Sequence, residues 1–429
     1  MDKGDEFRVV ITGMGIVSPI GVGIPAFTQS LKDGKSGIGR ISRYNPDDYP
    51  NIEVQIAGEC TDFKPEEHFS KKELRRIGIC TQLGLPSAIE AWEQSGLDMS
   101  KLNPYSVGIY LGTGMGGVKH DEDFRPTLEG GASARGKTSP FAVTNTMPTE
   151  LVYYTSEKYG IKGKQRSESS ACSSVGHALG DAYETLLTDH IIHKAPHNVP
   201  LEVIMVEGVE ACLTPSVVSS FGTMMATTKK YNDDPTRASR PFDALRDGFV
   251  QAEGSCCFVM ETYRHAKARG AEILAEVIGY GTTGDAGHIT APNIEGPSNA
   301  MHFALGMNQI SPTLVDYINA HGTSTPPNDR NETMVIRNVF GPHADKLMVS
   351  STKSMAGHGL GVSAGTELAA TIACMRGGFV HPTINYENPD PECDLDYVPN
   401  EARPANIQYA MSNSFGFGGT NVCLLIKKV

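Results

Sequence analysis

The chain has 429 residues, a net charge of −12, 39% hydrophobic residues and 20% charged residues, which is typical of a globular protein. The acidic balance argues against a general nucleic-acid binder, no apolar run approaches the ~20 residues of a membrane helix, and MDKGDEFR lacks a signal-peptide profile. Nine scattered cysteines indicate reduced thiols in a cytoplasm. The length predicts two domains or two fused halves.

The predicted strands repeat faintly along the chain. An apolar strand at residues 9–11 opens the first half, which has a second buried strand around Ile109. After a charged helical stretch, another apolar strand begins near Glu272, and a strand around Ile318 follows it. Because strands alternate with helices, the pattern predicts parallel sheets covered on both faces.

Two amphipathic helices are predicted at equivalent places in the two halves. The first follows Cys172, and its apolar face consists of Val175, Leu179, Ala182 and Leu186. The second follows His358, and its apolar face consists of Leu368, Ile372 and Met375. Gly377 and Gly378 are expected to end this second helix.

The stretch SESSACSSVGHALG places Cys172 where a buried run becomes a helix. Small neighbours leave room for a substrate, and the unpaired N–H groups and dipole of a helix start favour thiolate over thiol. This position suggests covalent catalysis, although a lone free cysteine is commonly a packing residue.

Three further motifs strengthen the catalytic interpretation. His321 lies in YINAHGTSTPPND, His358 in SSTKSMAGHGLG and Phe417 in SNSFGFGGTN, and each is a strand that runs into a turn. A single histidine is more often a core residue than a catalyst. A cysteine together with two histidine turns and a glycine turn is much harder to explain as packing.

With these motifs the chain resembles the β-ketoacyl-[acyl carrier protein] synthases of the type II elongating kind. The resemblance runs from FRVVITGMGIVSPIG to SNSFGFGGTNVCLLIKK, essentially the whole chain. It implies an α/β thiolase fold, in which duplicated βαβαβαββ halves form a five-layer αβαβα arrangement. Residues 1–265 would carry the nucleophilic cysteine, and residues 266–429 the two catalytic histidines.

The resemblance implies a decarboxylative Claisen condensation that gives a β-ketoacyl-acyl carrier protein. Cys172 would hold the acyl group while malonyl-acyl carrier protein loses carbon dioxide. The imidazoles of His321 and His358 would stabilise the resulting negative charge, and the N–H groups of Cys172 and Phe417 would form the oxyanion hole. No cofactor of its own is implied, because the substrate is carried on the phosphopantetheine of acyl carrier protein.

Other roles rest on the same resemblance. By composition alone, Lys353 could equally be a surface lysine without a function. The resemblance implies that it is the active-site lysine of the family and that its buried charge is paired with Glu332. Thr323 and Thr325 would line the pantetheine tunnel. The implied acyl-pocket residues are Met115, Ala142 and Phe221. At the pocket positions Met115, Ala142 and Val217, the side chains are larger or smaller than the resemblance leads us to expect. The sequence therefore does not indicate the length of the acyl chain.

Basic residues form two small groups. The first, in SKKELRRIG, consists of Lys71, Lys72, Arg75 and Arg76, and the second consists of Lys229 and Lys230. A charge run is usually a solvated face. Against an acidic background it also suits electrostatic steering of an acidic carrier protein, and the family docks its carrier at the position of the first group.

Two weaker signals are interpreted structurally. The sequence GTGMGG at residues 112–117 lacks the dinucleotide-binding spacing and is interpreted as a tight turn beside the acyl tunnel. The histidines of HIIHKAPHN, at positions 190, 193 and 197, have no accompanying ligand set. They predict a solvated loop, and no metal site is expected.

The strand before the nucleophile departs from the family pattern. It reads KQRSESSAC, with Arg166 and Glu168 where aliphatic residues are expected, and a later strand reads VEGVE around Gly208. In the family, this first strand pairs antiparallel with its copy across a dimer axis. An axis near Ser167 would bring Arg166 of one subunit to Glu168 of the other and specify a homodimer. The alternative is a heterodimer with a chain-length partner.

Three other protein classes were compared with the motif set. A thiolase needs a second cysteine where this chain has Phe417, and a non-catalytic chain-length subunit would lack Cys172. A starter-condensing synthase would carry a histidine and an asparagine and no motif lysine. The prediction is therefore a cytoplasmic elongating ketosynthase of fatty acid or specialised polyketide or lipid synthesis. A catalytic or chain-length subunit of a heterodimer stays open as a variant.

Overall fold

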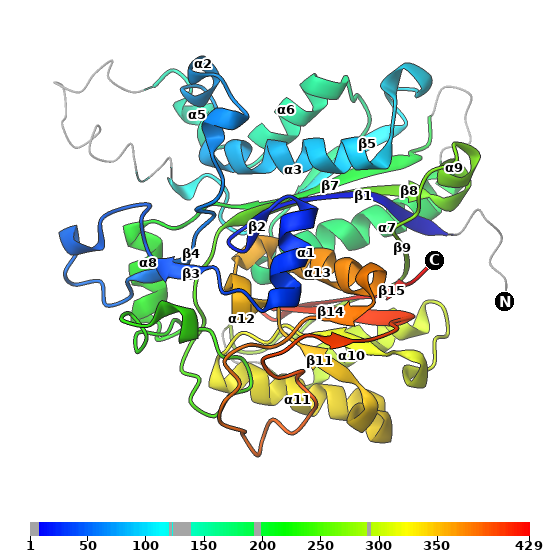
Figure 1. Cartoon of the computed structure of the whole chain (residues 1–429). Helices are drawn as coiled ribbons and strands as arrows, with labels where there is room; N and C mark the ends of the chain where they lie inside the picture. Colours follow the sequence, from blue (N-terminus) through cyan, green and yellow to red (C-terminus); the bar gives the residue numbers. More distant parts are fainter. Residues whose placement is uncertain (1–7, 120–121, 123–138, 193–198, 290–292) are drawn as a thin grey trace.

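The computed structural model describes residues 8–119, 122, 139–192, 199–289 and 293–429. Figure 1 shows five stacked layers, in which helices and sheets alternate. The two outer helical layers contain α3 (Ile79–Ser95) with α6 (Glu150–Tyr159), and α10 (Glu295–Gly306) with α11 (Pro326–Phe340). The middle layer contains α7 (Ser174–Ile192) and α13 (Ser363–Gly377). This arrangement confirms the predicted α/β thiolase fold.

The order of the strands shows that each sheet layer is built from one half of the chain. It reads β11-β10-β14-β15-β9-β1-β8-β7-β5-β6. The N-terminal strands are β1 (Val9–Ser18), β5 (Val107–Gly112), β6 (Gln165–Glu168), β7 (Val203–Glu210) and β8 (Gly254–Thr262). The C-terminal strands are β9 (Ala275–Gly284), β10 (Tyr317–Asn319), β11 (Met348–Ser350), β14 (Tyr409–Gly416) and β15 (Thr420–Lys427). A short antiparallel pairing of β1 with β9 joins the two sets.

The two sets of strands repeat one topology outward from this junction, and each is mixed, so the prediction of parallel sheets was only partly right. In each set, two antiparallel pairings are followed by two parallel ones: β1–β8 and β8–β7, then β7–β5 and β5–β6. The C-terminal series is β9–β15 and β15–β14, then β14–β10 and β10–β11. Strands β5 and β10 therefore occupy equivalent places, which confirms the predicted repeat between the strands around Ile109 and Ile318.

The middle helices are buried because both sheets pack on them. The predicted apolar residues of α7 and α13 are all buried. In α13, polar residues such as Glu367 and Thr371 are buried as well, since the helix has no face toward solvent. It ends at Gly377, and the next residue, Gly378, has a left-handed backbone with φ 67°, as the glycine pair predicted.

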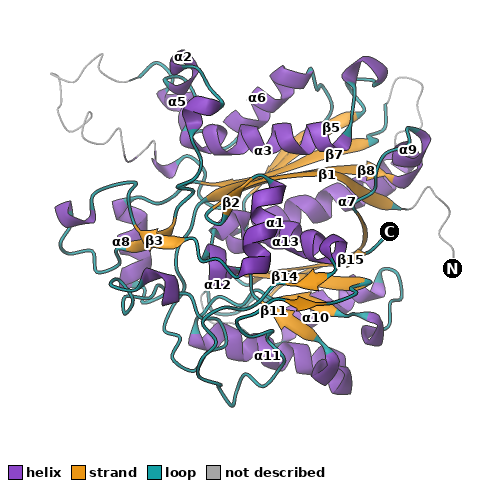
Figure 2. Cartoon of the chain, viewed as in Figure 1, coloured by secondary structure: helices purple, strands orange, loops and turns teal. Residues whose placement is uncertain are grey.

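Shorter elements surround this frame (Figure 2). The remaining helices are α1 (Ile24–Asp33), α2 (Lys71–Leu74), α5 (Ala142–Thr146), α8 (Pro215–Thr223), α9 (Tyr263–Ala268) and α12 (Lys353–Ala356). The short strands are β2 (Gly21–Val22), β3 (Ile38–Arg40), β4 (Ile56–Gly58), β12 (Phe379–Val380) and β13 (Arg403–Pro404). Within the described ranges, no helix combines the length and apolar character that crossing a membrane requires.

Candidate active site

Cys172 lies at the junction between edge strand β6 and central helix α7. A single 3-10 turn, Ala171–Ser173, connects the two elements, and α7 begins at Ser174. Ala171 has φ 53°, a left-handed conformation that costs energy in a residue other than glycine. This turn places the thiol at the start of the helix, as predicted, with 6% of the residue exposed.

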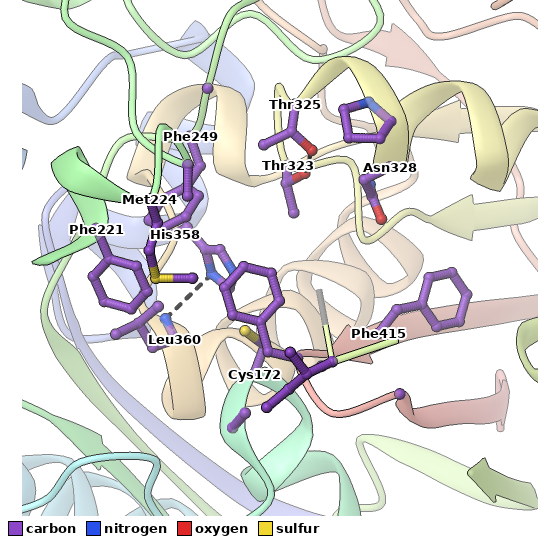
Figure 3. Close-up of a pocket in the computed structure, with 18 of the residues that line it drawn as sticks. Cys172, Phe221, Met224, Phe249, Thr323, Thr325, Asn328, His358, Leu360 and Phe415 are labelled. Atoms are coloured by element: carbon purple, nitrogen blue, oxygen red, sulfur yellow. Dashed lines mark hydrogen bonds between the residues drawn. The ribbon is translucent and has the colours of Figure 1, made fainter. Parts of the chain in front are cut away.

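A cavity of about 430 Å³ opens above this thiol. Seven of the predicted site residues line it: Met115, Cys172, Phe221, Thr323, Thr325, His358 and Phe417. Figure 3 shows the two threonines and Asn328 along one wall and the apolar side chains of Phe221, Met224 and Leu360 along another, with Cys172 and His358 between them. One end of the cavity therefore offers hydroxyl and amide groups, and the other offers apolar surface.

The two histidines meet inside the protein although they come from separate turns. Their ring centroids are 5.5 Å apart at an interplanar angle of 86°, and each residue is 3% exposed. The amide of Leu360 donates to Nδ1 of His358 at 3.2 Å, and the Ser363 hydroxyl lies closer to the same atom, at 2.9 Å. Nζ of Lys353 lies 3.3 Å from Nδ1 of His321. Because amide and ammonium groups only donate, both Nδ1 atoms accept, and each imidazole carries its proton on Nε2.

Electrostatics keep both imidazoles neutral. Burial lowers the pKa of His321 and of His358 well below the ordinary value, and the charge of Lys353 lowers both further. Each ring is therefore a neutral N–H donor at physiological pH. Two such donors suit the stabilisation of a developing oxyanion.

The predicted partner of Lys353 was wrong. Nζ of Lys353 forms a buried ion pair with Glu367 of α13 and donates to the carbonyl of His321 at 2.7 Å. Glu332 of α11 instead accepts the backbone N–H groups of His321 at 2.9 Å and Gly322 at 2.8 Å. Glu332 therefore supports the histidine turn, while Glu367 balances the lysine.

The sequence contained a signal for Glu367 that the motif comparison missed. Glu367 stands alone as an acidic residue in SAGTELAATIACM, a segment of small and apolar residues. A carboxylate in a helix buried on all sides requires a cationic or hydrogen-bonding partner. The buried Lys353 meets that requirement.

The expected thiolate preference of Cys172 also needs correction. Burial raises the pKa of this thiol to about 11, although a backbone hydrogen bond from Phe417 and the charge of Lys353 oppose the rise. Burial is the largest of these influences, so the Cys172 thiol holds its proton more tightly than a free cysteine does. The contact with Phe417 brings a backbone N–H beside the sulfur, where an oxyanion-hole donor is needed.

A glycine turn holds Phe417 in this place. Gly418 and Gly419 have φ 86° and 72°, which residues with a side chain rarely adopt. The amide of Gly418 donates to the carbonyl of Ile289 at 2.8 Å, and the amide of Asp285 donates to the carbonyl of Gly419 at 2.9 Å. The turn between β14 and β15 is thus attached to the segment that follows β9.

The remaining pocket predictions have different outcomes. The hydroxyl oxygens of Thr323 and Thr325 lie 2.8 Å apart on the cavity wall. Gly114 and Met115 line the cavity, and Gly116 has φ 53°, which fits the predicted tight turn. Ala142 lies on α5 and is not among the residues that line this cavity, so its role in binding the acyl chain stays a prediction. Other lining residues that the motifs missed are Met224, Phe249, Asn328 and Leu360.

The two basic groups lie on the surface. Lys71, Lys72, Arg75 and Arg76 are exposed on and just after α2. Lys229 forms an ion pair with Glu53, and Nζ of Lys230 lies 3.7 Å from Asp247, which lines the cavity. Of the histidines interpreted as a loop, His190 lies in the last turn of α7, and positions 193 and 197 fall outside the described residues.

Comparisons with known proteins agree with this fold. The family model for the N-terminal domain of β-ketoacyl synthases matches residues 6–266, and the model for the C-terminal domain matches residues 274–387. The chain is 42% identical to the 3-oxoacyl-[acyl-carrier-protein] synthase 2 of Coxiella burnetii over 99% of both chains. It is 40% identical to the Synechocystis protein of the same name, again over 99% of both.

Solved structures give the same result. A β-ketoacyl synthase from Burkholderia phymatum has a TM-score of 0.88 at 32% identity and covers 98% of this chain and 99% of its own. The ishigamide ketosynthase/chain length factor has a TM-score of 0.88 at 28% identity, with the same coverage. The protein is thus a condensing enzyme of the acyltransferase class. The chain belongs to the β-ketoacyl synthase family.

Proposed function

We propose that this protein condenses an acyl group held on Cys172 with malonyl-acyl carrier protein and releases a β-ketoacyl-acyl carrier protein. The observation that carries the proposal is the shared cavity, in which a buried thiol beside the Phe417 amide lies with the neutral N–H donor His358. A nucleophile, an oxyanion-hole donor and an imidazole donor are the groups that this reaction requires.

In the first half-reaction, the sulfur of Cys172 attacks the carbonyl carbon of an acyl thioester. The backbone N–H groups of Cys172 and Phe417 stabilise the tetrahedral oxyanion. The bond from carbon to the pantetheine sulfur then breaks. The proton of the Cys172 thiol passes to the departing pantetheine thiolate, so that an acyl-enzyme and a free carrier thiol result.

In the second half-reaction, the malonyl thioester loses carbon dioxide. The electrons of the broken carbon–carbon bond form an enolate. Its oxygen accepts hydrogen bonds from the Nε2–H groups of His321 and His358. The carbanion carbon attacks the acyl carbonyl on Cys172, the carbon–sulfur bond breaks, and the cysteine sulfur takes up one proton. Lys353 maintains the donor form of His321 through its contact with Nδ1.

The cavity walls suit a substrate that arrives on phosphopantetheine. The hydroxyls of Thr323 and Thr325 and the amide of Asn328 provide hydrogen-bonding groups for the pantetheine amides. Phe221 belongs to the apolar side, where the acyl chain would lie, and Met115 also lines the cavity. The first basic group, at Lys71, Lys72, Arg75 and Arg76, and the second, at Lys229 and Lys230, would attract an acidic carrier protein.

The proposal extends to assembly and location. Residues 1–265 and 266–429 act as two fused halves, each of which supplies part of the site. Exposed β6 pairs with its copy in a homodimer, and pairing with a chain-length partner is the rival arrangement. All nine cysteines are free and buried, which supports a cytoplasmic location.

Loading with an acyl group tests the function directly. The parent and Cys172→Ala are incubated with acyl-acyl carrier protein, and the intact protein mass is measured. The parent gains one acyl mass, and Cys172→Ala gains none. Equal labelling of the two proteins would contradict the assignment of the nucleophile.

A further inference from the structure

Glu210 is a buried carboxylate beside the active site that the reaction steps above do not use. It ends β7, and none of its surface is exposed. Its Oε2 atom accepts the backbone N–H groups of Gly114 at 2.8 Å and Gly361 at 3.0 Å. Its Oε1 atom accepts those of Met115 at 2.9 Å and Gly116 at 3.2 Å. One side chain therefore holds two turns from opposite halves of the chain.

The second of these turns controls the environment of His358. Gly361 follows Leu360, whose amide donates to Nδ1 of His358 at 3.2 Å. Leu360 has φ 49°, a conformation that costs energy in leucine and persists only when its surroundings hold it. The hydrogen bond from Gly361 to Glu210 is a fixed point immediately after this strained residue.

Close packing leaves the two turns no room to move toward each other. A Cβ atom on Gly361 would lie 2.2 Å from the backbone nitrogen of Gly114 and 2.7 Å from Oε2 of Glu210. A Cβ atom on Gly114 would lie 2.8 Å from the same oxygen. Both glycines are therefore needed for the backbones to approach one carboxylate.

We propose that Glu210 is a positioning residue that acts through His358. By anchoring Gly361, it keeps in place the Leu360 amide, which shares Nδ1 of His358 with the Ser363 hydroxyl. The imidazole proton then stays on Nε2, where the enolate oxygen of the malonyl group needs a donor. Its other contacts fix the turn around Met115 on the acyl side of the cavity. This inference rests on the proposed function, because it assumes that His358 stabilises that enolate.

The ionised carboxylate fits these four contacts, because it offers lone pairs on both oxygen atoms, whereas the amide of glutamine replaces one oxygen with two further N–H donors. Burial raises the pKa of Glu210 to about 7, and the four backbone N–H groups oppose that rise because they favour the charged form. In Glu210→Gln, an NH₂ group would therefore face backbone N–H groups and leave them without an acceptor. The turn that carries Leu360 would lose its anchor.

Glu207 on the same strand provides a matched control. It is also fully buried, and one of its oxygens accepts the hydroxyl of Thr155, while the other has no hydrogen-bond partner within the described part of the chain. Residues three apart in a strand point to opposite faces, so Glu207 faces away from the turns held by Glu210. Glu207→Gln removes a buried carboxylate without affecting Gly361.

The test compares the two half-reactions in purified variants. Carbon dioxide release from malonyl-acyl carrier protein and acyl mass on Cys172 are measured for the parent, Glu210→Gln, Glu207→Gln, His358→Ala and His358→Ala/Glu210→Gln. We expect Glu210→Gln to lose roughly 10-fold in carbon dioxide release with acylation within about 3-fold of the parent, and Glu207→Gln to match the parent. In the His358→Ala background, Glu210→Gln should change the rate by less than about 2-fold, since both changes remove the same interaction.

Several outcomes would overturn the positioning role. An equal loss in both half-reactions indicates a general structural role, and no loss in either shows that the anchor does not matter. An undiminished effect of Glu210→Gln in the His358→Ala background shows that Glu210 does not act through His358. If Glu210→Gln does not fold, Glu210→Asp, which keeps the charge but is one methylene shorter, is judged by the same criteria. Acyl labelling of Cys172→Ala would instead overturn the proposed function itself.

Discussion

Edge strand β6 leads directly to Cys172 of the catalytic centre. The charged side chains of the centre are buried, whereas those of β6 are partly exposed. In the centre, Lys353 and Glu367 are buried as an ion pair, with 2% and 1% of their side chains exposed. On the edge, Nη1 of Arg166 lies 3.5 Å from Asp181, with 42% and 30% of the side chains exposed. The charges of this buried pair therefore compensate each other within one chain, whereas the charges of β6 are still open to solvent or to another protein.

The acidic residues of the edge make the contrast sharper. Burial raises the pKa of Glu168, the nearby carboxylate of Asp181 raises it further, and Arg166 opposes both effects. One arginine thus lies near two carboxylates. The comparison indicates that buried charge defines the reaction centre, while partly exposed charge on β6 is available to define a partner.

Breaking the buried ion pair is expected to have the largest effect on stability. Lys353→Met leaves Glu367 buried without its cation, which should lower the free energy of unfolding by about 3–5 kcal/mol. Lys353→Met/Glu367→Leu should recover much of this loss, because neither charge then remains uncompensated. Urea denaturation measures both variants. Lys229→Met, which breaks the exposed pair with Glu53, is the control and should change stability little.

Removing either histidine donor is expected to have a large effect on one half-reaction. His321→Ala and His358→Ala should lose roughly 10²-fold or more in carbon dioxide release from malonyl-acyl carrier protein, the scale of one lost oxyanion donor. Both should still accept an acyl group on Cys172, because the Phe417 amide does not depend on either ring. Unchanged carbon dioxide release in either variant would contradict the assignment.

The sequence predicted the parts of the site that are local motifs. Cys172, His321, His358 and Phe417 each lie in a turn whose residues are adjacent in the chain, so the motif itself determines the local backbone. The partners of buried charges depend on tertiary packing. Glu367 is 14 residues from Lys353, and Glu210 is 151 residues from Gly361, and no spacing rule predicts either contact.

The same distinction applies to the fold and to the thiol. Hydrophobic periodicity predicted the middle helices, and the repeat of strands predicted the two equivalent halves. The pKa of Cys172 was misjudged because a helix start is visible in the sequence, whereas the depth of burial is a property of the assembled layers.

Reversing charges at the proposed carrier-docking surface should have a moderate effect. Lys72→Glu/Arg75→Glu should reduce the rate with carrier-bound substrate roughly 10-fold. Added salt should lower the same rate of the parent, because exposed charges act over only about 8–10 Å at moderate ionic strength. The rate with a short pantetheine thioester, which does not need docking, is the control. A parallel loss with both substrates would show that these residues are structural.

The last prediction concerns β6 and has the smallest expected effect, on the order of 1 kcal/mol per exposed charge pair. Arg166 lies close enough to Asp181 to interact within its own chain, and its exposed side chain also leaves it able to reach Glu168 of a second copy. Antiparallel pairing centred on Ser167 would place these two residues opposite each other twice. An arginine brought to Glu168 lowers the raised pKa of that carboxyl, so association should be favoured at neutral pH and weaken as the pH falls and Glu168 is protonated.

Sedimentation of the chain alone, of Arg166→Glu and of Arg166→Glu/Glu168→Arg distinguishes the two assemblies. A homodimer is weakened in the single variant, which places like charges opposite each other, and is restored in the swap, which recreates both pairs in reverse. The matched control is Lys164→Glu, a charge reversal next to the strand that does not change the Arg166–Glu168 register. A parent that remains monomeric until a second, different chain is added would replace the homodimer with the heterodimer, because the carboxylate of Glu168 would then pair with a cation of another protein.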